Sequence, residues 1–272
     1  SKPTLQGLRN CKAIVRCGVG YDNVDITAAR ECGIHVMNVP DYGSEEVADS
    51  ALGMIMSLTR GINLAQSLLR TGQTQWSHDA LIPLHRLRGR VLGIIGLGRI
   101  GTAVALRAKA VGMEVVYYDP YTPAGRDKAL GIRCIDSLDE LLSQAYVLSL
   151  HCPSTEETRS MINAAAIEKM PAGSYLVNTA RGNIVENAAI PAAIVAGQLA
   201  GAGLDVLNVE PPLDDDVLLT AWRDPQHPAH HRVIVNPHIA FYCEESLQEM
   251  REKAAISTRR ALLGEPLRNV VN

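Results

Sequence analysis

Aromatic residues, metal-type cysteine spacings and long apolar runs are all scarce or missing in this sequence. Phe, Trp and Tyr make up only 4% of the 272 residues, whereas glycine and small aliphatic residues are abundant, which suits helices packed closely on a parallel sheet. The six cysteines show no CxxC spacing, so we interpret them as small apolar residues of a reducing compartment and expect no metal site. No apolar run approaches the roughly 18 residues of a membrane span, and no signal-peptide pattern opens the sequence. These absences lead us to expect a cytoplasmic protein.

A strong charge of either sign is also lacking. The formal net charge is −3, which gives no electrostatic footprint for nucleic acid or for an anionic membrane. We interpret the basic clusters at 85–90 and 259–260 as solvated surface. Neither nucleic acid nor a membrane is therefore expected as a direct partner. The hydrophobic content of 47% supports a substantial core, in one large or two medium domains.

The most informative stretch is an apolar run that leads into the pattern Gly96-x-Gly98-x-x-Gly101 and then into an alanine-rich helix. Glycines at these positions permit a tight turn, a close approach of the backbone to a pyrophosphate, and close packing of the helix on the strand. The N-terminus of the helix adds unpaired N–H groups and a positive dipole. The next predicted strand, 114–118, is followed by Asp119, about the 20 residues downstream at which an acidic residue holds an adenosine ribose. This context favours a dinucleotide site over an ordinary turn with incidental glycines.

Strand and helix patterns alternate from Arg90 onward. Apolar strands separated by helices predict a doubly wound parallel sheet, and we assign 86–238 to an α/β, Rossmann-type domain. Residues 1–85 contain a shorter βαβ pattern and one long helix from Ser44 to about Leu69, and we assign them to a separate, partial domain. The remaining segment, 239–272, predicts one more helix, at 244–263, and is expected to pack back towards the first domain.

A second glycine-rich turn, Gly18-Val19-Gly20, follows a predicted strand near the start of the chain. The backbone N–H groups of such a turn can bind an anion. An ordinary strand-to-helix loop is the alternative, and it would be favoured if this turn stood alone.

Three ionisable residues, Arg181, Glu210 and His238, each come shortly after a predicted strand of the larger domain. Ligands of open parallel sheets bind outside the carboxyl ends of the strands, so these side chains are expected on one rim beside the cofactor. Asp205 is a fourth candidate, near the end of a predicted strand at 203–206, and an acid is costly to bury there without a partner. A cofactor amide is one natural partner of Asp205, and a backbone-capping role is the alternative.

The first three residue types fit a single reaction. An arginine guanidinium is a planar fork that matches a carboxylate and an adjacent oxygen. A histidine can give a proton to a carbonyl oxygen as hydride reaches the carbon, and can take it back in reverse. A glutamate bonded to the far ring nitrogen fixes the tautomer and favours the imidazolium. Each residue alone would be a cap, a surface ion pair or a loop histidine, but their occurrence at successive strand ends favours a catalytic site.

The assembled motifs resemble the D-isomer-specific 2-hydroxyacid dehydrogenases, and they run through nearly the whole chain in the order of that family. The motifs are Gly93–Gly101, His151-Cys-Pro, Leu176-Val-Asn-Thr-Ala-Arg-Gly182, Gly203-Leu-Asp-Val with Glu210-Pro, and Asn236-Pro-His238. Within the family, further segments are most similar to the C-terminal-binding-protein branch. These segments are 18–25, 45–50, 104–110, 118–121, 249–252 and 269–272.

The resemblance implies a Rossmann-type NAD domain and a smaller, flavodoxin-like substrate domain, with the active site in the cleft and a homodimer formed through the nucleotide domain. Family members carry a further strand–helix unit before the segment at Lys12, so the substrate domain is expected to be N-terminally truncated. The resemblance assigns the substrate carboxylate to Arg181 and to the N–H groups of Gly18–Gly20, acid/base work to His238, and the histidine partner to Glu210. The implied cofactor contacts are Gly96, Gly98, Arg99, Ile100, Gly101, Asp119, Cys152, Thr179, Asp205 and His238.

The leading hypothesis is an enzyme that interconverts a 2-oxo acid and a D-2-hydroxy acid with NAD(H). Asp119 favours NAD over NADP, because a carboxylate repels the 2′-phosphate. The alternative is an NAD(H)-responsive scaffold or transcriptional corepressor of the C-terminal-binding-protein type, since a fold and a cofactor site do not fix function. The presence of Arg181, Glu210 and His238 favours the enzyme.

Overall fold

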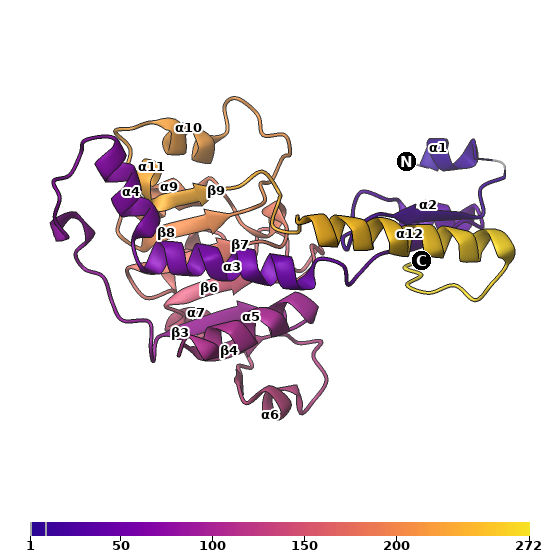
Figure 1. Cartoon of the computed structure of the whole chain (residues 1–272), viewed down its shortest axis with the longest axis horizontal. Coiled ribbons are helices and arrows are strands. Elements are labelled where there is room, and N and C mark those ends of the chain that lie inside the picture. The colour runs from indigo at the N-terminus through magenta and orange to yellow at the C-terminus, as the bar shows by residue number, and fades with distance from the viewer. Residues whose placement is uncertain (1, 9) are drawn as a thin grey trace. The chain divides into compact units, whose positions relative to one another are not determined.

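The chain, for which the computed structural model describes residues 2–8 and 10–272, divides into two compact units. Unit 1 consists of Ser1–Glu46 and Phe241–Asn272, and unit 2 consists of Val47–Ala240. Figure 1 labels the elements of both. Among the described helices, none is both long and apolar enough to cross a bilayer.

Unit 1 is built around two parallel strands. Its elements are α1 (Lys2–Gln6), β1 (Ala13–Arg16), α2 (Ile26–Glu31), β2 (His35–Asn38) and α12 (Glu244–Leu263). β1 and β2 pair from Ala13 with His35 to Arg16 with Asn38. Helix α2 begins after Asp25, whose carboxylate accepts the Ala28 N–H at 2.9 Å. Helix α12 packs on β1, and it has the bounds that the sequence predicts.

Unit 2 is a doubly wound α/β domain, which confirms the predicted fold class. Its strands are β3 (Val91–Ile95), β4 (Glu114–Tyr118), β5 (Arg133–Cys134), β6 (Val147–Leu150), β7 (Ser174–Asn178), β8 (Leu199–Leu204) and β9 (Val233–Val235). Its helices are α3 (Ser44–Thr59, whose first turn belongs to unit 1), α4 (Ile62–Arg70), α5 (Arg99–Ala110), α6 (Arg126–Leu130), α7 (Leu138–Gln144), α8 (Ala164–Glu168), α9 (Ala189–Val195), α10 (Val217–Arg223) and α11 (Ala229–Arg232), with short 3-10 turns η1 (Asp79–Leu81) and η2 (Gly182–Ile184).

The sheet of unit 2 has the strand order β5-β4-β3-β6-β7-β8-β9, and every neighbouring pair is parallel. The chain leaves β3 towards β4 and β5, and then returns to the other side of β3 with β6. The strand order therefore reverses between β3 and β6, which is the point at which open sheets bind their ligands. Figure 1 shows α3 and α5 against this sheet.

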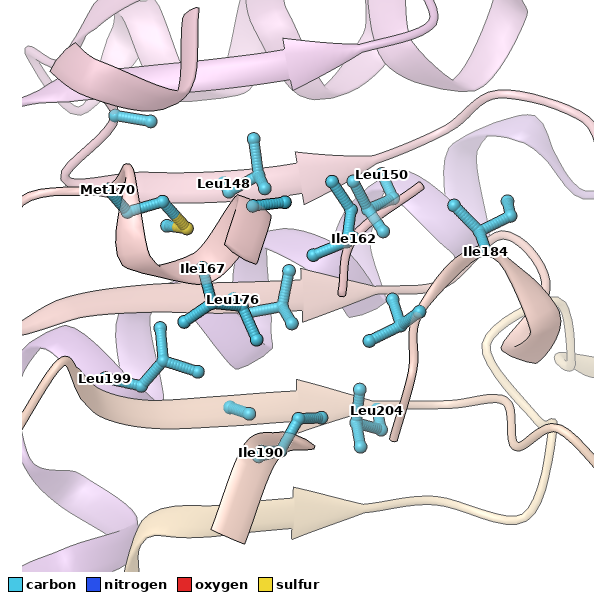
Figure 2. Close-up of a cluster of buried hydrophobic side chains, with 14 of the residues drawn as sticks. Leu148, Leu150, Ile162, Ile167, Met170, Leu176, Ile184, Ile190, Leu199 and Leu204 are labelled. Atoms are coloured by element: carbon cyan, nitrogen blue, oxygen red, sulfur yellow. The ribbon is translucent and has the colours of Figure 1, made fainter. Parts of the chain in front are cut away.

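Apolar residues cover both faces of this sheet. On one face, Leu148, Leu176 and Leu204 lie on neighbouring strands and pack with residues of the connecting segments such as Ile162 and Ile167 (Figure 2). All five side chains are almost fully buried. The other face is covered by residues of α3 and α5. Strands buried on both sides explain why their sequences are apolar throughout rather than alternating.

The division between the units differs from the boundary near 85 that the sequence suggests. Ala51, Ile55 and Leu58 of α3 belong to the same buried cluster as Leu92 and Ile94 of β3, so α3 is part of unit 2. The amphipathic pattern of α3 shows that one side is buried but not which sheet buries it.

Two further local predictions are wrong. The expected single helix from Ser44 to Leu69 is interrupted at Gly61, which has φ +64° and precedes α4. The strand expected at 203–206 lies earlier, at Leu199–Leu204, so that Asp205 follows the strand directly.

Candidate active site

The loop between β3 and α5 has the backbone geometry of a ligand cradle. Gly96 has φ +89°, and a Cβ there would lie 2.6 Å from the Cys152 nitrogen. A Cβ on Gly101 would lie 2.1 Å from the Gly96 carbonyl oxygen, so α5 can begin this close to the turn only with glycine. At Gly98, by contrast, a Cβ would meet no atom of the described chain within 4 Å. The protein itself requires the first and third glycines, and the second leaves space for a ligand.

Asp119 lies beside this loop, at the end of β4. One carboxylate oxygen accepts the Leu97 N–H at 2.8 Å and the other accepts the Tyr121 N–H at 2.9 Å. The carboxylate therefore shapes the glycine loop as well as bringing negative charge to its rim. Arg99 is exposed in the first turn of α5, beside half-buried Ile100.

His151 and Cys152 form the neighbouring strand end, after β6. Burial raises the pKa of the Cys152 thiol to about 12, so this side chain is a neutral apolar wall of the loop. His151 shares a hydrogen bond of 2.9 Å with Ser149 through Nε2, and its Nδ1 is buried with no hydrogen-bond partner among the described residues. Burial also lowers the pKa of His151 to about 3, which keeps the ring neutral.

Arg181 stands on a turn that is fastened to the end of β7 by Asn178. The Asn178 side chain is fully buried; its oxygen accepts the Ala180 N–H at 3.0 Å and its nitrogen donates to the Arg181 carbonyl at 2.9 Å. The guanidinium Nη1 donates to the Ala180 carbonyl at 2.7 Å. Asn178 thereby fixes the three-residue turn from which the arginine projects.

Glu210 and His238 are brought into direct contact. His238 Nδ1 and Glu210 Oε2 are 2.6 Å apart, and the two side chains are 42% and 36% exposed, so the pair is open to a substrate on one side. The other oxygen, Oε1, accepts the Leu207 N–H at 2.8 Å, which orients the carboxylate. Contact with a carboxylate places a proton on Nδ1 and fixes the orientation of the ring.

Asp205 holds the turn that carries His238. Its side chain is 2% exposed, and its two carboxylate oxygens accept the Ile239 and Ala240 N–H groups, each at 3.0 Å. Its own carbonyl accepts the His238 N–H at 2.7 Å. His238 has φ +55°, a conformation that a non-glycine residue keeps only when its surroundings determine it. These contacts are those of the capping role that the sequence leaves open as an alternative.

The second glycine turn belongs to unit 1 and follows β1. Gly18 has φ +148°, and its carbonyl accepts the Val39 N–H at 3.1 Å, while the Asn38 side chain donates to the Val19 carbonyl at 2.7 Å. The Arg16 guanidinium lies over the turn and donates to the Cys17 carbonyl. The substrate role of Gly18, Val19 and Gly20 stays a prediction.

The predicted residues of the larger domain gather at the carboxyl edge of its sheet, because they follow β3, β4, β6, β7, β8 and β9. Sequence reasoning did not single out Asn178, which fastens the arginine turn. Asn178 could have been found from the sequence, because it is a polar residue at the end of a mainly apolar strand, which is the pattern that identified Asp205.

The residues at this edge fit a dinucleotide. Gly98 leaves room where a pyrophosphate needs backbone, and Asp119 offers a carboxylate at the distance along the chain expected for a ribose. The hydroxyl of Thr179, 7% exposed, has no hydrogen-bond partner among the described residues, which is the signature of a polar group that a ligand completes.

Comparison with known proteins agrees with this geometry. Residues 52–240 match the model of the D-isomer specific 2-hydroxyacid dehydrogenase NAD-binding domain. The chain is 37% identical over 268 residues to a D-3-phosphoglycerate dehydrogenase of Archaeoglobus fulgidus, covering 98% of this chain and 48% of that protein. It is 35% identical to the D-3-phosphoglycerate dehydrogenase of Methanocaldococcus jannaschii, covering 100% of this chain and 49% of that protein. It thus spans about half the length of these two relatives.

Solved structures give the same result. The D-lactate dehydrogenase of Aquifex aeolicus, complexed with NAD and lactic acid, is 33% identical with a TM-score of 0.86, over 97% of this chain and 80% of that one. The holo D-mandelate dehydrogenase of Rhodotorula graminis is 30% identical with a TM-score of 0.89, over 100% of this chain and 78% of that one. The cofactor of the cradle is NAD, and the chain belongs to the D-isomer specific 2-hydroxyacid dehydrogenase family.

Proposed function

We propose that this protein interconverts a 2-oxo acid and a D-2-hydroxy acid with NAD(H), with His238 as the acid and base. The observation that supports this most is the 2.6 Å contact between His238 and Glu210, on the same sheet edge as the NAD cradle. NAD(H), when bound, supplies or accepts the hydride. The chain's own contribution is to bind the carboxylate, orient the carbonyl and move one proton.

The proton moves through His238 Nε2 in this proposal, because Nδ1 is engaged by Glu210. In reduction the imidazolium gives its proton to the forming alkoxide, and in oxidation the neutral ring takes the hydroxyl proton back. The Glu210 carboxylate holds the ring through Nδ1 and keeps Nε2 pointing in one direction.

Arg181 binds the substrate carboxylate and carbonyl through its planar fork of N–H donors. The turn fixed by Asn178 holds the backbone of this arginine in place before a substrate arrives, so less conformational freedom is lost on binding. In unit 1, the N–H groups of Gly18–Gly20 are proposed to bind a substrate carboxylate. Asp119 discriminates against the 2′-phosphate of NADP.

The proposed substrate is a small-molecule 2-oxo or 2-hydroxy acid. The test is NADH oxidation followed by absorbance, with glyoxylate, hydroxypyruvate, pyruvate, phenylglyoxylate and 3-phosphohydroxypyruvate, the last because two relatives are named D-3-phosphoglycerate dehydrogenases. We expect turnover of at least one compound by the full chain and loss of it in His238→Ala. Absence of turnover over the whole panel would refute the proposal.

The second candidate is an NAD(H)-responsive scaffold or corepressor of the C-terminal-binding-protein type, and the segments at 18–25 and 45–50 are the observation in its favour. A scaffold gains nothing from an oriented Glu210–His238 pair, which is why we place the enzyme first. Capture of peptide partners that depends on NADH, with negligible turnover, would reverse this order.

We also propose that the protein works as a cytoplasmic homodimer formed through unit 2, with neither nucleic acid nor membrane as a direct partner. Light scattering coupled to size-exclusion chromatography measures the mass in solution directly. A monomer at micromolar concentration would contradict the dimer.

A further inference from the structure

The turns that carry Arg181 and Glu210 are in direct backbone contact. A Cβ on Gly182, the residue after Arg181, would lie 2.0 Å from the Leu207 carbonyl carbon and 2.6 Å from the Asn208 nitrogen. The two turns follow different strands, β7 and β8, yet they approach as closely as only glycine permits. A displacement of one turn must therefore displace the other.

The Asn208 side chain ties these turns together. Its amide nitrogen donates to the Gly182 carbonyl at 2.6 Å and to the Val185 carbonyl at 3.1 Å; the amide orientation is assigned from these contacts, because the opposite one would place oxygen against two carbonyls. Asn208 is an exposed residue, so packing in a core does not account for it. Its two donated hydrogen bonds connect 208 to the η2 turn.

The neighbour of Asn208 orients the catalytic pair. The Leu207 N–H donates to Glu210 Oε1 at 2.8 Å, and Glu210 Oε2 contacts His238 Nδ1 at 2.6 Å. A carboxylate held at both oxygens has one orientation, whereas a carboxylate held at one can rotate. Leu207 therefore links the two turns: its carbonyl lies against Gly182, and its N–H orients the carboxylate that contacts the histidine ring.

We propose that Asn208 is a positioning residue that couples the carboxylate-binding Arg181 to the Glu210–His238 pair. The expected effect on turnover rests on the proposed function, whereas the expected effect on the orientation of the His238 ring does not. None of the contacts above joins the Asn208 amide to the side chain of Arg181, Glu210 or His238. Asn208 acts through the backbone of Gly182 and through its neighbour Leu207. Misplacement of reacting groups by about 1 Å can lower a rate by about 10²-fold, so we expect effects of about 10- to 100-fold.

The test compares three full-length variants. Asn208→Ala removes both donors, and Asn208→Asp has the same shape but places a carboxylate against two carbonyls. Val209→Ala is the matched control, because Val209 is 50% exposed in the same turn. We expect Asn208→Ala to raise KM and to lower kcat together, by about 10- to 100-fold in kcat/KM, with Asn208→Asp the more severe. NADH affinity should stay within about two-fold, since the glycine loop is not part of this connection.

A signal of His238 that does not depend on turnover separates the two proposals. In ¹⁵N-histidine-labelled protein, the Nδ1–H of a histidine bonded to a carboxylate gives a far-downfield resonance, which His238→Gln identifies by its loss. We expect this resonance to move upfield or to vanish by exchange in Asn208→Asp and to stay in Val209→Ala. If the wild type turns over nothing but the resonance responds, the proposed function fails and the positioning role stands. An unchanged resonance in both Asn208 variants, or kinetics equal to those of Val209→Ala, would overturn the positioning role.

Discussion

Removal of the Asp205 carboxylate is the most direct test of how the His238 turn is held. The side chain is buried, and both of its oxygens accept backbone N–H groups of the next two residues, Ile239 and Ala240. Asp205→Ala leaves two donors without an acceptor in a place where water has little access. Asp205→Asn keeps one acceptor oxygen and turns an amide N–H towards the other donor.

The magnitude follows from the two hydrogen bonds. An unsatisfied buried donor costs about 1–3 kcal/mol, so Asp205→Ala should lower the free energy of unfolding by about 2–6 kcal/mol and Asp205→Asn by about 1–3 kcal/mol. Relief from burying a charge works in the opposite direction, because desolvation of an ion costs several kcal/mol. We expect the hydrogen-bond loss to exceed this relief, since the carboxylate is satisfied at both oxygens, and we place the alanine variant near the lower half of its range.

The assay is urea unfolding without NADH, followed by tryptophan fluorescence. Trp76 and Trp222 both lie in unit 2, and the Trp222 indole donates to the Val233 carbonyl at 3.1 Å, so the signal reports this unit. Asp136→Ala, at an exposed position of the same unit, is the control. The free energy of unfolding of Asp205→Ala is compared with that of the control. A difference within about 0.5 kcal/mol, the size of an ordinary surface change, would mean that the Asp205 carboxylate does not hold this turn. Stability that is unaffected together with weakened NADH binding would instead support the cofactor-amide role.

Three other perturbations have expected outcomes. Gly101→Ala should weaken both folding and NADH binding because its Cβ would lie 2.1 Å from a backbone oxygen, whereas Gly98→Ala should leave the thermal midpoint unchanged and weaken NADH binding alone; equal midpoints for both would contradict the geometry. His238→Ala should lower kcat by about 10²- to 10⁴-fold with NADH affinity within a few-fold, and a loss below tenfold in the steady-state assay would mean another proton donor. The pKa of His151 is lowered to about 3 by burial and is about 6.5 in an unfolded chain, so the unfolded state binds the extra proton and stability should fall as pH falls from about 6.5 towards 3. His151→Gln should make the free energy of unfolding, measured by urea titration at several pH values, depend less on pH. An unchanged pH dependence would mean that other groups cause it.

The sequence was sufficient for the strands of unit 2 other than β5 and β8, and for the residues that follow them. These strands are mostly apolar and buried, and the parallel topology places their carboxyl ends on one edge of the sheet. The short strand β5 is exposed on both residues and carries no such signal. The meeting of Glu210 and His238 therefore followed from strand ends, although 28 positions separate them in the chain. The glycine loop was equally accessible, because the glycine spacing and the approach of Gly101 to Gly96 are local, although the approach of Cys152 to Gly96 is not.

The sequence was insufficient where one pattern is compatible with two partners. Helix α3 has the same buried stripe whether unit 1 or unit 2 covers it, so the boundary was placed about forty residues too late. The interruption at Gly61 depends on a left-handed residue that glycine permits but does not impose. Asn208 carries no periodic signal, because its role comes from a contact between two turns that follow different strands.

The three groups proposed for catalysis all stand on turns, and each turn is held by hydrogen bonds at its base. Each turn begins next to a buried polar residue whose hydrogen bonds are completed by the turn's own backbone: Asn178 for Arg181, and Asp205 for His238. Such a residue makes the turn fold with the strand, because separation would leave buried polar groups unsatisfied. Glu210 is held from within its own turn, because its carboxylate accepts the Leu207 N–H. The order of these three turns is therefore established when unit 2 folds. In the proposed reaction, substrate binding energy would then not be needed to arrange these residues and would remain for the transition state.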